Sequence, residues 1–263
     1  MAKEAVLFIH STGAGPFLWS GTPESAVGGR AMLFPANLGY APNPEIPRGT
    51  TVTVDDEARH LLGQIPSDAD QVHVVAHSYG GLVGLHVIEA LGARAASAFL
   101  FEPVLFGALR HDVSSDPAAV AEAVTFATDP RFVFDEELGG REEWLERFVD
   151  YWNRPGSWKK IPAPMRELNL AAGWKMFQEV RACFYADRPF DDWKLTIPTT
   201  LVRGERSTPA ARAMALALAR SRPNATLVEM AGAPHMAPLT QPAKVHDEIA
   251  RHFDRLARLS PVS

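Results

Sequence analysis

Short apolar segments alternate with amphipathic segments of helical length along most of the chain, and no other feature of the sequence constrains the fold as strongly. The apolar segments lie at residues 5–10, 31–34, 72–76, 98–101, 199–202 and 226–230. The segments with helical periodicity lie at residues 54–64, 80–91, 209–220 and 242–259. Continuous apolar runs are typical of strands buried on both faces, and strands that alternate with helices connect through right-handed crossovers. We therefore expect an α/β fold, with a mostly parallel sheet of about six strands and helices on both of its faces.

The alternation stops between residues 104 and 192. This stretch has no convincing apolar strand and shows three helical patterns: one begins at Asp116-Pro117, one spans residues 141–153, and one spans residues 165–186 with a break at Gly173. A chain of 263 residues is long enough for one large domain that carries an insertion. The expected division is residues 1–103 and 193–263 for the α/β core and residues 104–192 for a helical insertion.

Five of the six tryptophans lie in this stretch or at its end. They are Trp144, Trp152, Trp158, Trp174 and Trp193. One interpretation is that they form the core of a small helical subdomain. The other is that some of them line an apolar pocket above the sheet, because ligand pockets favour aromatic walls. Trp152 and Trp174 are the candidates for such a pocket, and the two interpretations can hold for different residues.

The composition narrows the classes of function. Lys and Arg number 26 and Asp and Glu number 31, and the resulting net charge of −5 argues against a protein that binds nucleic-acid phosphates. No apolar run approaches the ~20 residues that span a bilayer, and the beginning of the chain reads as a strand rather than as a signal peptide. The single Cys183 excludes an internal disulfide framework. We expect a cytoplasmic enzyme or small-molecule binder with no nucleic-acid or membrane partner.

The most informative motif is VHVVAHSYGG at residues 72–81, where a buried strand runs directly into a helix. A serine on such a sharp turn has a strained backbone and an exposed hydroxyl, and the helix N-terminus offers free N–H groups beside it. Small residues are needed at Ala76 and Gly80 because the strand and helix backbones pass close together. This motif resembles the nucleophile elbow of the α/β-hydrolase superfamily, which reads G-x-S-x-G. The resemblance implies that Ser78 is the nucleophile, with Ala76 in place of the first glycine.

The loop after the first strand, FIHSTGAGPFLW, occupies the place of the superfamily's oxyanion loop. That loop usually begins with His-Gly, whereas here the second residue is Ser11. The resemblance implies an oxyanion hole formed by the backbone N–H of Ser11 or Thr12 together with that of Tyr79. An alternative interpretation treats Gly13-Ala14-Gly15 as a dinucleotide-binding loop. It fails because Leu18 stands where the third glycine belongs and no acidic residue ends a second strand.

A histidine in the Gly/Pro-rich loop after the last strand, MAGAPHMAPLTQP, has the position of the superfamily's general base. The resemblance therefore assigns the base to His235. We interpret the other histidines as ordinary core or surface residues, and we expect the side chain of His77 to point away from the cleft. The remaining ones are His10, His60, His73, His86, His111, His246 and His252. None has a metal-ligand spacing such as H-E-x-x-H, so we expect no metal and no other cofactor.

The acid that completes a catalytic triad has two candidate positions. The superfamily commonly carries it after the second-last strand as Gly-x-x-Asp, but this chain reads Gly204-Glu205-Arg206-Ser207 there. Some members instead carry it after the strand that follows the elbow helix, where this chain has Glu102-Pro103. A carboxylate is required because a hydroxyl cannot compensate the charge of an imidazolium. We expect Glu102 to be the acid, with Glu205, or no acid at all, as the alternatives.

The resemblance covers essentially the whole chain, and it makes residues 104–192 a cap domain over the nucleophile. It implies a serine hydrolase that cleaves a small, largely apolar carboxylic ester through an acyl-enzyme intermediate. Lactones, thioesters and carbon–carbon bonds flanked by a ketone are open to the same machinery. Because the usual aspartate is missing, the alternative is a hydrolase-shaped binding protein or receptor with little turnover.

Overall fold

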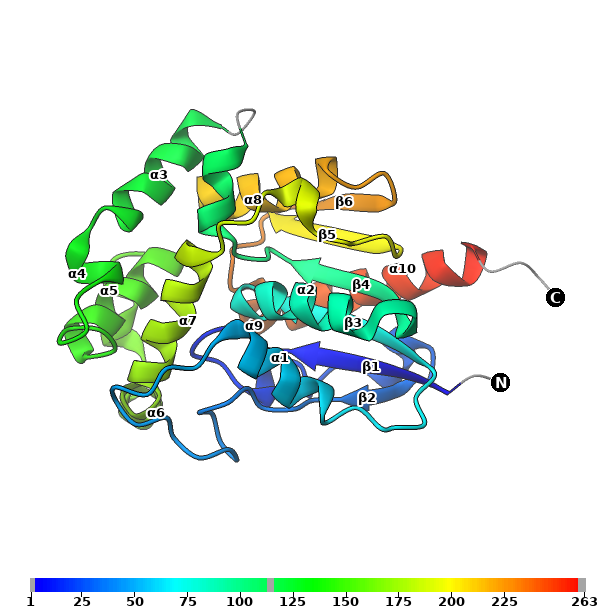
Figure 1. The fold of residues 1–263 in the computed structure, drawn as a ribbon, viewed down its shortest axis with the longest axis horizontal. Coiled ribbons are helices and arrows are strands. Elements are labelled where there is room, and N and C mark those ends of the chain that lie inside the picture. The colour runs from blue at the N-terminus through cyan, green and yellow to red at the C-terminus, as the bar shows by residue number, and fades with distance from the viewer. Residues whose placement is uncertain (1–2, 113–115, 260–263) are drawn as a thin grey trace.

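In the part of the chain that the computed structural model describes, residues 3–112 and 116–259, six parallel strands form one sheet. The strands are β1 (Glu4–Ile9), β2 (Ala31–Leu33), β3 (Gln71–His77), β4 (Ala95–Phe101), β5 (Thr199–Gly204) and β6 (Ala225–Met230). Their order is β2-β1-β3-β4-β5-β6, and each neighbouring pair is parallel. The predicted α/β fold is therefore confirmed, and β3 and β4 lie at the centre of the sheet (Figure 1).

Helices accompany these strands, and side chains cap two of them, α1 (Val54–Leu62) and α8 (Pro209–Arg220), at their N-termini. The others are α2 (Tyr79–Leu91), α9 (Ala237–Thr240) and α10 (Pro242–Leu259), with short 3-10 helices η1 (Pro16–Leu18), η2 (Glu24–Val27), η3 (Gly92–Arg94) and η6 (Phe190–Asp192). The side chain of Thr53 accepts the backbone N–H of Asp56, whose carboxylate accepts that of Thr53, so α1 begins with a capping box. Among the described residues, no helix combines the length and the apolar character that crossing a membrane requires.

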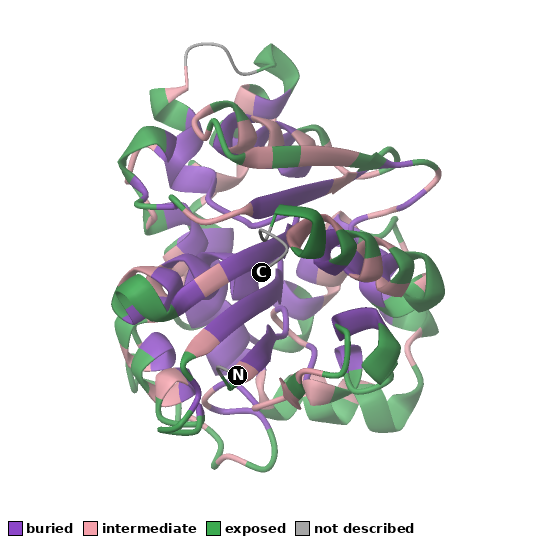
Figure 2. Cartoon of the chain, turned by 90° about the vertical axis from the view of Figure 1, so that its right-hand side faces the viewer, coloured by how far each residue is buried: buried purple, intermediate pink, exposed green. Residues whose placement is uncertain are grey.

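The two faces of the sheet bury different side chains because successive residues of a strand point in opposite directions. Leu7 of β1 belongs to a cluster with buried residues of α1, α2 and α8. Phe8, the next residue, belongs to a second cluster with residues of η2 and α10. Figure 2 shows the result, with buried strands between helices whose outer sides are exposed. The edge strand β6 is only partly buried.

Between β4 and η6, all the elements within the described residues are helical. They are η4 (Phe106–His111), α3 (Pro117–Ala127), α4 (Pro130–Val133), α5 (Glu142–Trp152), η5 (Trp158–Lys160), α6 (Ala163–Ala171) and α7 (Gly173–Tyr185). They gather at the carboxyl ends of the strands (Figure 1). The helix α4 could not be predicted from the sequence, because four residues are too few for a periodic pattern. The break at Gly173 separates α6 from α7, and a Cβ atom there would lie 2.0 Å from the carbonyl oxygen of Gly140.

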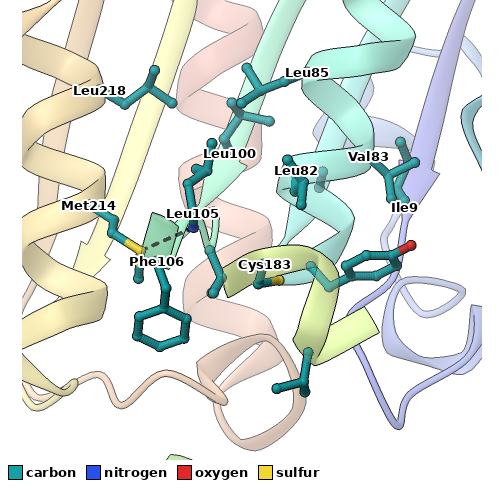
Figure 3. Close-up of a cluster of buried hydrophobic side chains, with 14 of the residues drawn as sticks. Ile9, Leu82, Val83, Leu85, Leu100, Leu105, Phe106, Cys183, Met214 and Leu218 are labelled. Atoms are coloured by element: carbon teal, nitrogen blue, oxygen red, sulfur yellow. Dashed lines mark hydrogen bonds between the residues drawn. The ribbon is translucent and has the colours of Figure 1, made fainter. Parts of the chain in front are cut away.

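The helical segment shares one apolar core with the face of the sheet covered by α2 and α8. Figure 3 shows part of this core, where Leu82 from α2, Leu100 from β4 and Met214 from α8 belong to one cluster. The backbone nitrogen of Leu105 lies 3.0 Å from the sulfur of Met214. Cys183 of α7 lies in the same cluster, so the segment packs directly on the carboxyl end of the sheet.

Candidate active site

Ser78 occupies a strained turn between β3 and α2. Its φ of 58° and ψ of −125° place the backbone in a region that non-glycine residues rarely adopt. The turn brings α2 against neighbouring backbone: a Cβ atom on Gly80 would lie 2.5 Å from the carbonyl oxygen of His10, and one on Gly81 would lie 2.5 Å from Cβ of Pro103. Only glycine fits at these two positions. The sharp turn leaves the Ser78 side chain lining two cavities.

The alanine at the first elbow position fits because the helix provides space for it. A Cβ atom on Gly84, in the next turn of α2, would lie 3.3 Å from Cβ of Ala76. A side chain at position 84 would therefore press against the methyl group of Ala76. The departure from G-x-S-x-G at Ala76 is thus accommodated by a glycine one helical turn beyond the motif.

Three side chains predicted from separate parts of the sequence are connected by two hydrogen bonds. Nε2 of His235 lies 3.1 Å from Oγ of Ser78, and Nδ1 of His235 lies 2.6 Å from Oε2 of Glu102. Ser78, His235 and Glu102 are 6%, 2% and 0% exposed. The tautomer with its proton on Nδ1 donates to Glu102 and accepts from Ser78, which satisfies both contacts. In this arrangement His235 can remove the hydroxyl proton of Ser78 as the serine oxygen attacks an electrophile.

Glu102 reaches the imidazole because the chain turns sharply at the end of β4. Its φ of 42° is in the left-handed region, which is uncommon for a residue other than glycine. Its backbone N–H donates to the carbonyl of Val202, and its Oε1 accepts the N–H of Gly204 at 2.6 Å. The second carboxylate candidate, Glu205, instead accepts the N–H of Gly232 at 2.7 Å and is exposed. The structure brings Glu102, and not Glu205, to His235.

The predicted oxyanion loop is fixed by a buried histidine, His10, whose expected role was that of an ordinary core or surface residue. Nδ1 of His10 donates to the carbonyl of Ser11 at 2.9 Å, and its Nε2 accepts the N–H of Asn37 at 3.0 Å. Burial lowers the pKa of His10 to about 4, so the ring is neutral near pH 7. Thr12 lines both cavities beside Ser78, whereas Ser11 lines one of them. Tyr79 lines the smaller one, so the residues predicted to supply the oxyanion N–H groups lie around Ser78.

A buried ionic cluster holds the same loop from the other side. The N–H of Gly13 donates to the hydroxyl of Tyr40 at 3.0 Å, and this hydroxyl donates to Oε2 of Glu179 at 2.7 Å. Nζ of Lys175 lies 2.5 Å from Glu179 and 2.7 Å from Glu57, and all three charged side chains are at most 1% exposed. Burial opposes the charge of Lys175, but the two carboxylates outweigh it and raise its pKa. Burial also raises the pKa of Glu179. We call Glu57, Lys175, Glu179 and Tyr40 the buried ionic cluster.

His77, next to Ser78, supports the loop that carries His235. Its Nε2 donates to the carbonyl oxygen of His235 at 2.9 Å, and the centres of the two rings are 4.7 Å apart. Burial lowers the pKa of His77 well below its ordinary value, so it is neutral. His77 lines neither cavity at Ser78, as expected of a side chain that points away from the cleft.

The two candidate pocket tryptophans have different surroundings. Trp152 of α5 lines both cavities at Ser78, and its ring stacks on His235. Trp174 of α7 lines neither: its Nε1 donates to the carbonyl of Thr50 at 2.8 Å, and its ring packs against Phe177. The expectation that Trp174 lines the pocket was therefore wrong. The residue packs α7 against the segment before α1, in line with the alternative interpretation as a core residue.

The residues considered for cofactor binding take other roles. Gly13 of the Gly13-Ala14-Gly15 segment donates to Tyr40 and lines the larger cavity at Ser78. Over residues 3–112 and 116–259, no group of three or more His, Cys, Asp or Glu side chains could hold a metal ion. That the chain needs no cofactor stays a prediction, based on the chemistry available to Ser78 and His235.

Comparison with known proteins places this geometry in a family. The model of the alpha/beta hydrolase family matches residues 6–248. The lipase LipV of Mycobacterium tuberculosis is 25% identical over 174 residues, which cover 60% of this chain and 59% of that protein. The chain thus aligns with less than two thirds of this relative.

Two solved structures share the fold at low sequence identity. An esterase of Thermogutta terrifontis is 19% identical, with a TM-score of 0.65 over 97% of this chain and 91% of the other. The enol-lactonase of Burkholderia xenovorans LB400 is 16% identical, with a TM-score of 0.65 over 97% and 92%. These two structures confirm the predicted α/β fold. Since the family model spans nearly the whole chain, the chain belongs to the alpha/beta hydrolase family.

Proposed function

We propose that this hydrolase cleaves small, largely apolar carboxylic esters through an acyl-enzyme on Ser78. The observation that carries the proposal is the buried chain of contacts from Glu102 through His235 to Ser78. A serine is a weak nucleophile by itself, and an adjacent base in hydrogen-bond contact is what activates it. Residues that line the neighbouring cavities are mostly apolar or aromatic, which supports an apolar substrate.

In the first half-reaction, Oγ of Ser78 attacks the ester carbonyl carbon as its proton passes to Nε2 of His235. The carboxylate of Glu102 stabilises the resulting imidazolium and holds its orientation. The negative charge that develops on the carbonyl oxygen accepts hydrogen bonds from the N–H groups of Tyr79 and of Thr12 or Ser11. The carbon–oxygen bond to the alcohol then breaks, and the proton on Nε2 passes to the departing oxygen.

In the second half-reaction, water takes the place of the alcohol. His235 accepts a proton from the water as its oxygen attacks the acyl carbon, and it returns that proton to Oγ of Ser78 as the acid leaves. The products are one alcohol and one carboxylic acid for each water consumed. Lactones and thioesters have the same electrophilic carbonyl and fit the same sequence of steps. No metal or organic cofactor enters any step.

We further propose that the helices of residues 104–192 act as a cap domain. Trp152 and Phe148 of α5 line both cavities at Ser78, and Cys183 of α7 lines the smaller one. Side chains from this segment would thus decide which substrates fit. A cytoplasmic location, a small-molecule substrate and the absence of nucleic-acid and membrane partners stay predictions from the sequence.

The direct test is ester turnover in paired serine variants. Wild-type protein is expected to hydrolyse p-nitrophenyl acetate, and Ser78→Ala is expected to lose at least about 10³-fold in kcat. Ser97→Ala is the matched control, because Ser97 is a fully buried serine on β4 that contacts His73 and His252 and lines neither cavity. Equal turnover in Ser78→Ala and wild type would overturn the proposal. A folded wild-type protein that binds esters without turnover would instead favour the binding-protein alternative.

A further inference from the structure

Two cavities of very different size meet at Ser78. The outer cavity has a volume of about 420 Å³, and the inner one has about 20 Å³, which is room for about one water molecule. Ser78 and Thr12 lie at their junction, since both residues line both cavities. Phe148 and Trp152 of α5 are the other shared residues, so these two rings separate the cavities.

The position of His235 distinguishes the two cavities chemically. His235 lines the outer cavity and is absent from the walls of the inner one, which has Tyr79 instead. In ester cleavage the departing oxygen takes its proton from the base and must come within hydrogen-bond distance of Nε2. The alcohol part of the ester therefore belongs in the outer cavity. The acyl part, bound to the same carbonyl carbon, is directed to the other side and belongs in the inner cavity.

Two stacked rings form part of the wall of the inner cavity. The rings of Phe106 and Phe184 have centroids 4.4 Å apart and planes within 5° of parallel. Both residues also line a third cavity, of about 420 Å³, between η4, α3 and α7. That third cavity shares no other residue with the inner one. The stacked pair is thus the wall between the acyl side of Ser78 and a large space beyond it.

We propose that the site selects esters of a short acid, such as acetate, with a larger, mainly apolar alcohol. This inference rests on the proposed function and specifies its substrate class. The inner cavity accommodates a methyl group but no extended chain. The outer cavity offers apolar contacts from Phe17, Ile161 and Leu239, with Lys160 and Asn169 as polar groups among its walls.

Two isomeric esters test this selection without changing hydrophobicity. Hexyl acetate has a short acid and a long alcohol, and ethyl hexanoate has the reverse. We expect kcat/KM for hexyl acetate to exceed that for ethyl hexanoate by about tenfold or more, since excluded methylenes are discriminated to this extent. Equal values, or a preference for ethyl hexanoate, would overturn the inference and leave the proposed hydrolase intact. Failure of both esters, together with no covalent adduct from a fluorophosphonate, would overturn the proposed function and this inference with it.

Variants of the stacked pair Phe106 and Phe184 provide a second test of the inference. Phe184→Ala is expected to join the inner cavity to the space beyond and to raise kcat/KM for ethyl hexanoate about tenfold or more, with a smaller change for hexyl acetate. Phe134→Ala is the control, because Phe134 lines only the third cavity and is 53% exposed. Phe134→Ala is expected to keep the wild-type ratio of kcat/KM for hexyl acetate to kcat/KM for ethyl hexanoate.

A smaller change covers the case in which Phe184→Ala does not fold. Of the three cavities, Val180 lines only the inner one. Val180→Ala therefore enlarges the inner cavity and leaves the stacked rings of Phe106 and Phe184 in place. This variant is expected to change the ratio of the two kcat/KM values severalfold in favour of ethyl hexanoate. An unchanged ratio in a folded Phe184→Ala or Val180→Ala variant would contradict the assignment of the inner cavity to the acyl group.

Discussion

The indole of Trp152 stacks on the imidazole of His235, with ring centroids 3.8 Å apart and planes inclined by 21°. Trp152 is the last residue of α5, so a helix inserted between β4 and β5 contacts the histidine that follows β6. The stack covers one side of the imidazole and restricts the orientation of the ring. Trp152 is therefore a positioning residue for the proposed base as well as a wall between two cavities.

Removing this stack is expected to reduce activity beyond its effect on stability. Trp152→Ala should lower kcat for p-nitrophenyl acetate about tenfold, because the imidazole loses a fixed neighbour and a misplaced catalytic group can cost up to ~10²-fold. Trp158→Ala is the control: Trp158 is 1% exposed and lines neither cavity at Ser78. Both variants should lose about 3–5 kcal/mol of unfolding free energy. If Trp152→Ala keeps the kcat of Trp158→Ala, the stack has only a packing role.

The acid is tested by replacing a carboxylate with an amide of the same shape. Glu102→Gln is expected to lower kcat about 10³–10⁴-fold, because an amide cannot stabilise the imidazolium and favours the wrong tautomer of His235. Its side-chain oxygen can still accept the N–H of Gly204, so the fold should be retained. Glu205→Gln, which alters the carboxylate beside Gly232, should have nearly wild-type kinetics. The opposite ranking of the two variants would assign the acid to Glu205.

Removing the cation from the buried ionic cluster should cost more stability than breaking an exposed ion pair, because it leaves uncompensated buried charges. Lys175→Met leaves Glu57 and Glu179 facing each other without a cation, and breaking a buried pair in this way costs about 3–5 kcal/mol. Lys159→Met breaks an ion pair with Glu146 in which the lysine side chain is 72% exposed, and it should cost less than about 1 kcal/mol. Urea unfolding at neutral pH measures both changes. Equal, small losses would show that the cluster is not important for stability.

Buried neutral histidines should make the protein less stable in mild acid. Burial lowers the pKa of His252 to about 3 in the folded protein, against about 6.5 in the unfolded chain. Above about pH 6.5 both states are neutral, and this histidine has no effect on the pH dependence. Below that pH only the unfolded state takes up the proton, so stability falls by up to about 1.4 kcal/mol per pH unit until the folded state also titrates.

The measurement is urea unfolding of wild type and His252→Gln between about pH 7 and pH 5. Glutamine can retain a hydrogen bond to Ser97 or Thr200, the two partners of His252, but it takes up no proton. The decrease in unfolding free energy should therefore be about 1–2 kcal/mol smaller in the variant over this interval. Parallel pH profiles for the two proteins would show that His252 titrates normally in the folded state.

The sheet and the residues around Ser78 could be predicted because their signals are local. Each inner strand contains a short apolar run, and Ser78 and Glu102 directly follow the strands β3 and β4. Because all strands of a parallel sheet run in the same direction, the carboxyl ends of β3 and β4 lie together at one edge of the sheet. His235 could be placed because it follows the last strand in a loop rich in glycine and proline.

The supports of the site could not be predicted because they connect residues far apart in sequence. Lys175 and Glu179 are spaced like an ordinary exposed ion pair on a helix, and nothing in the sequence brings Glu57 or Tyr40 to them. His10 likewise bonds Asn37 through a loop without periodicity. The distinction between Trp152 and Trp174 depends on how α5 and α7 pack, which aromatic content alone does not determine.

The central claim, that His235 and Glu102 activate Ser78, is tested most directly by intact-protein mass spectrometry after treatment with a fluorophosphonate. We predict one adduct per chain in the wild type and in Glu205→Gln, a much slower adduct in Glu102→Gln, and none in Ser78→Ala. An adduct that persists in Ser78→Ala, or a folded wild-type protein that forms none, would contradict the claim.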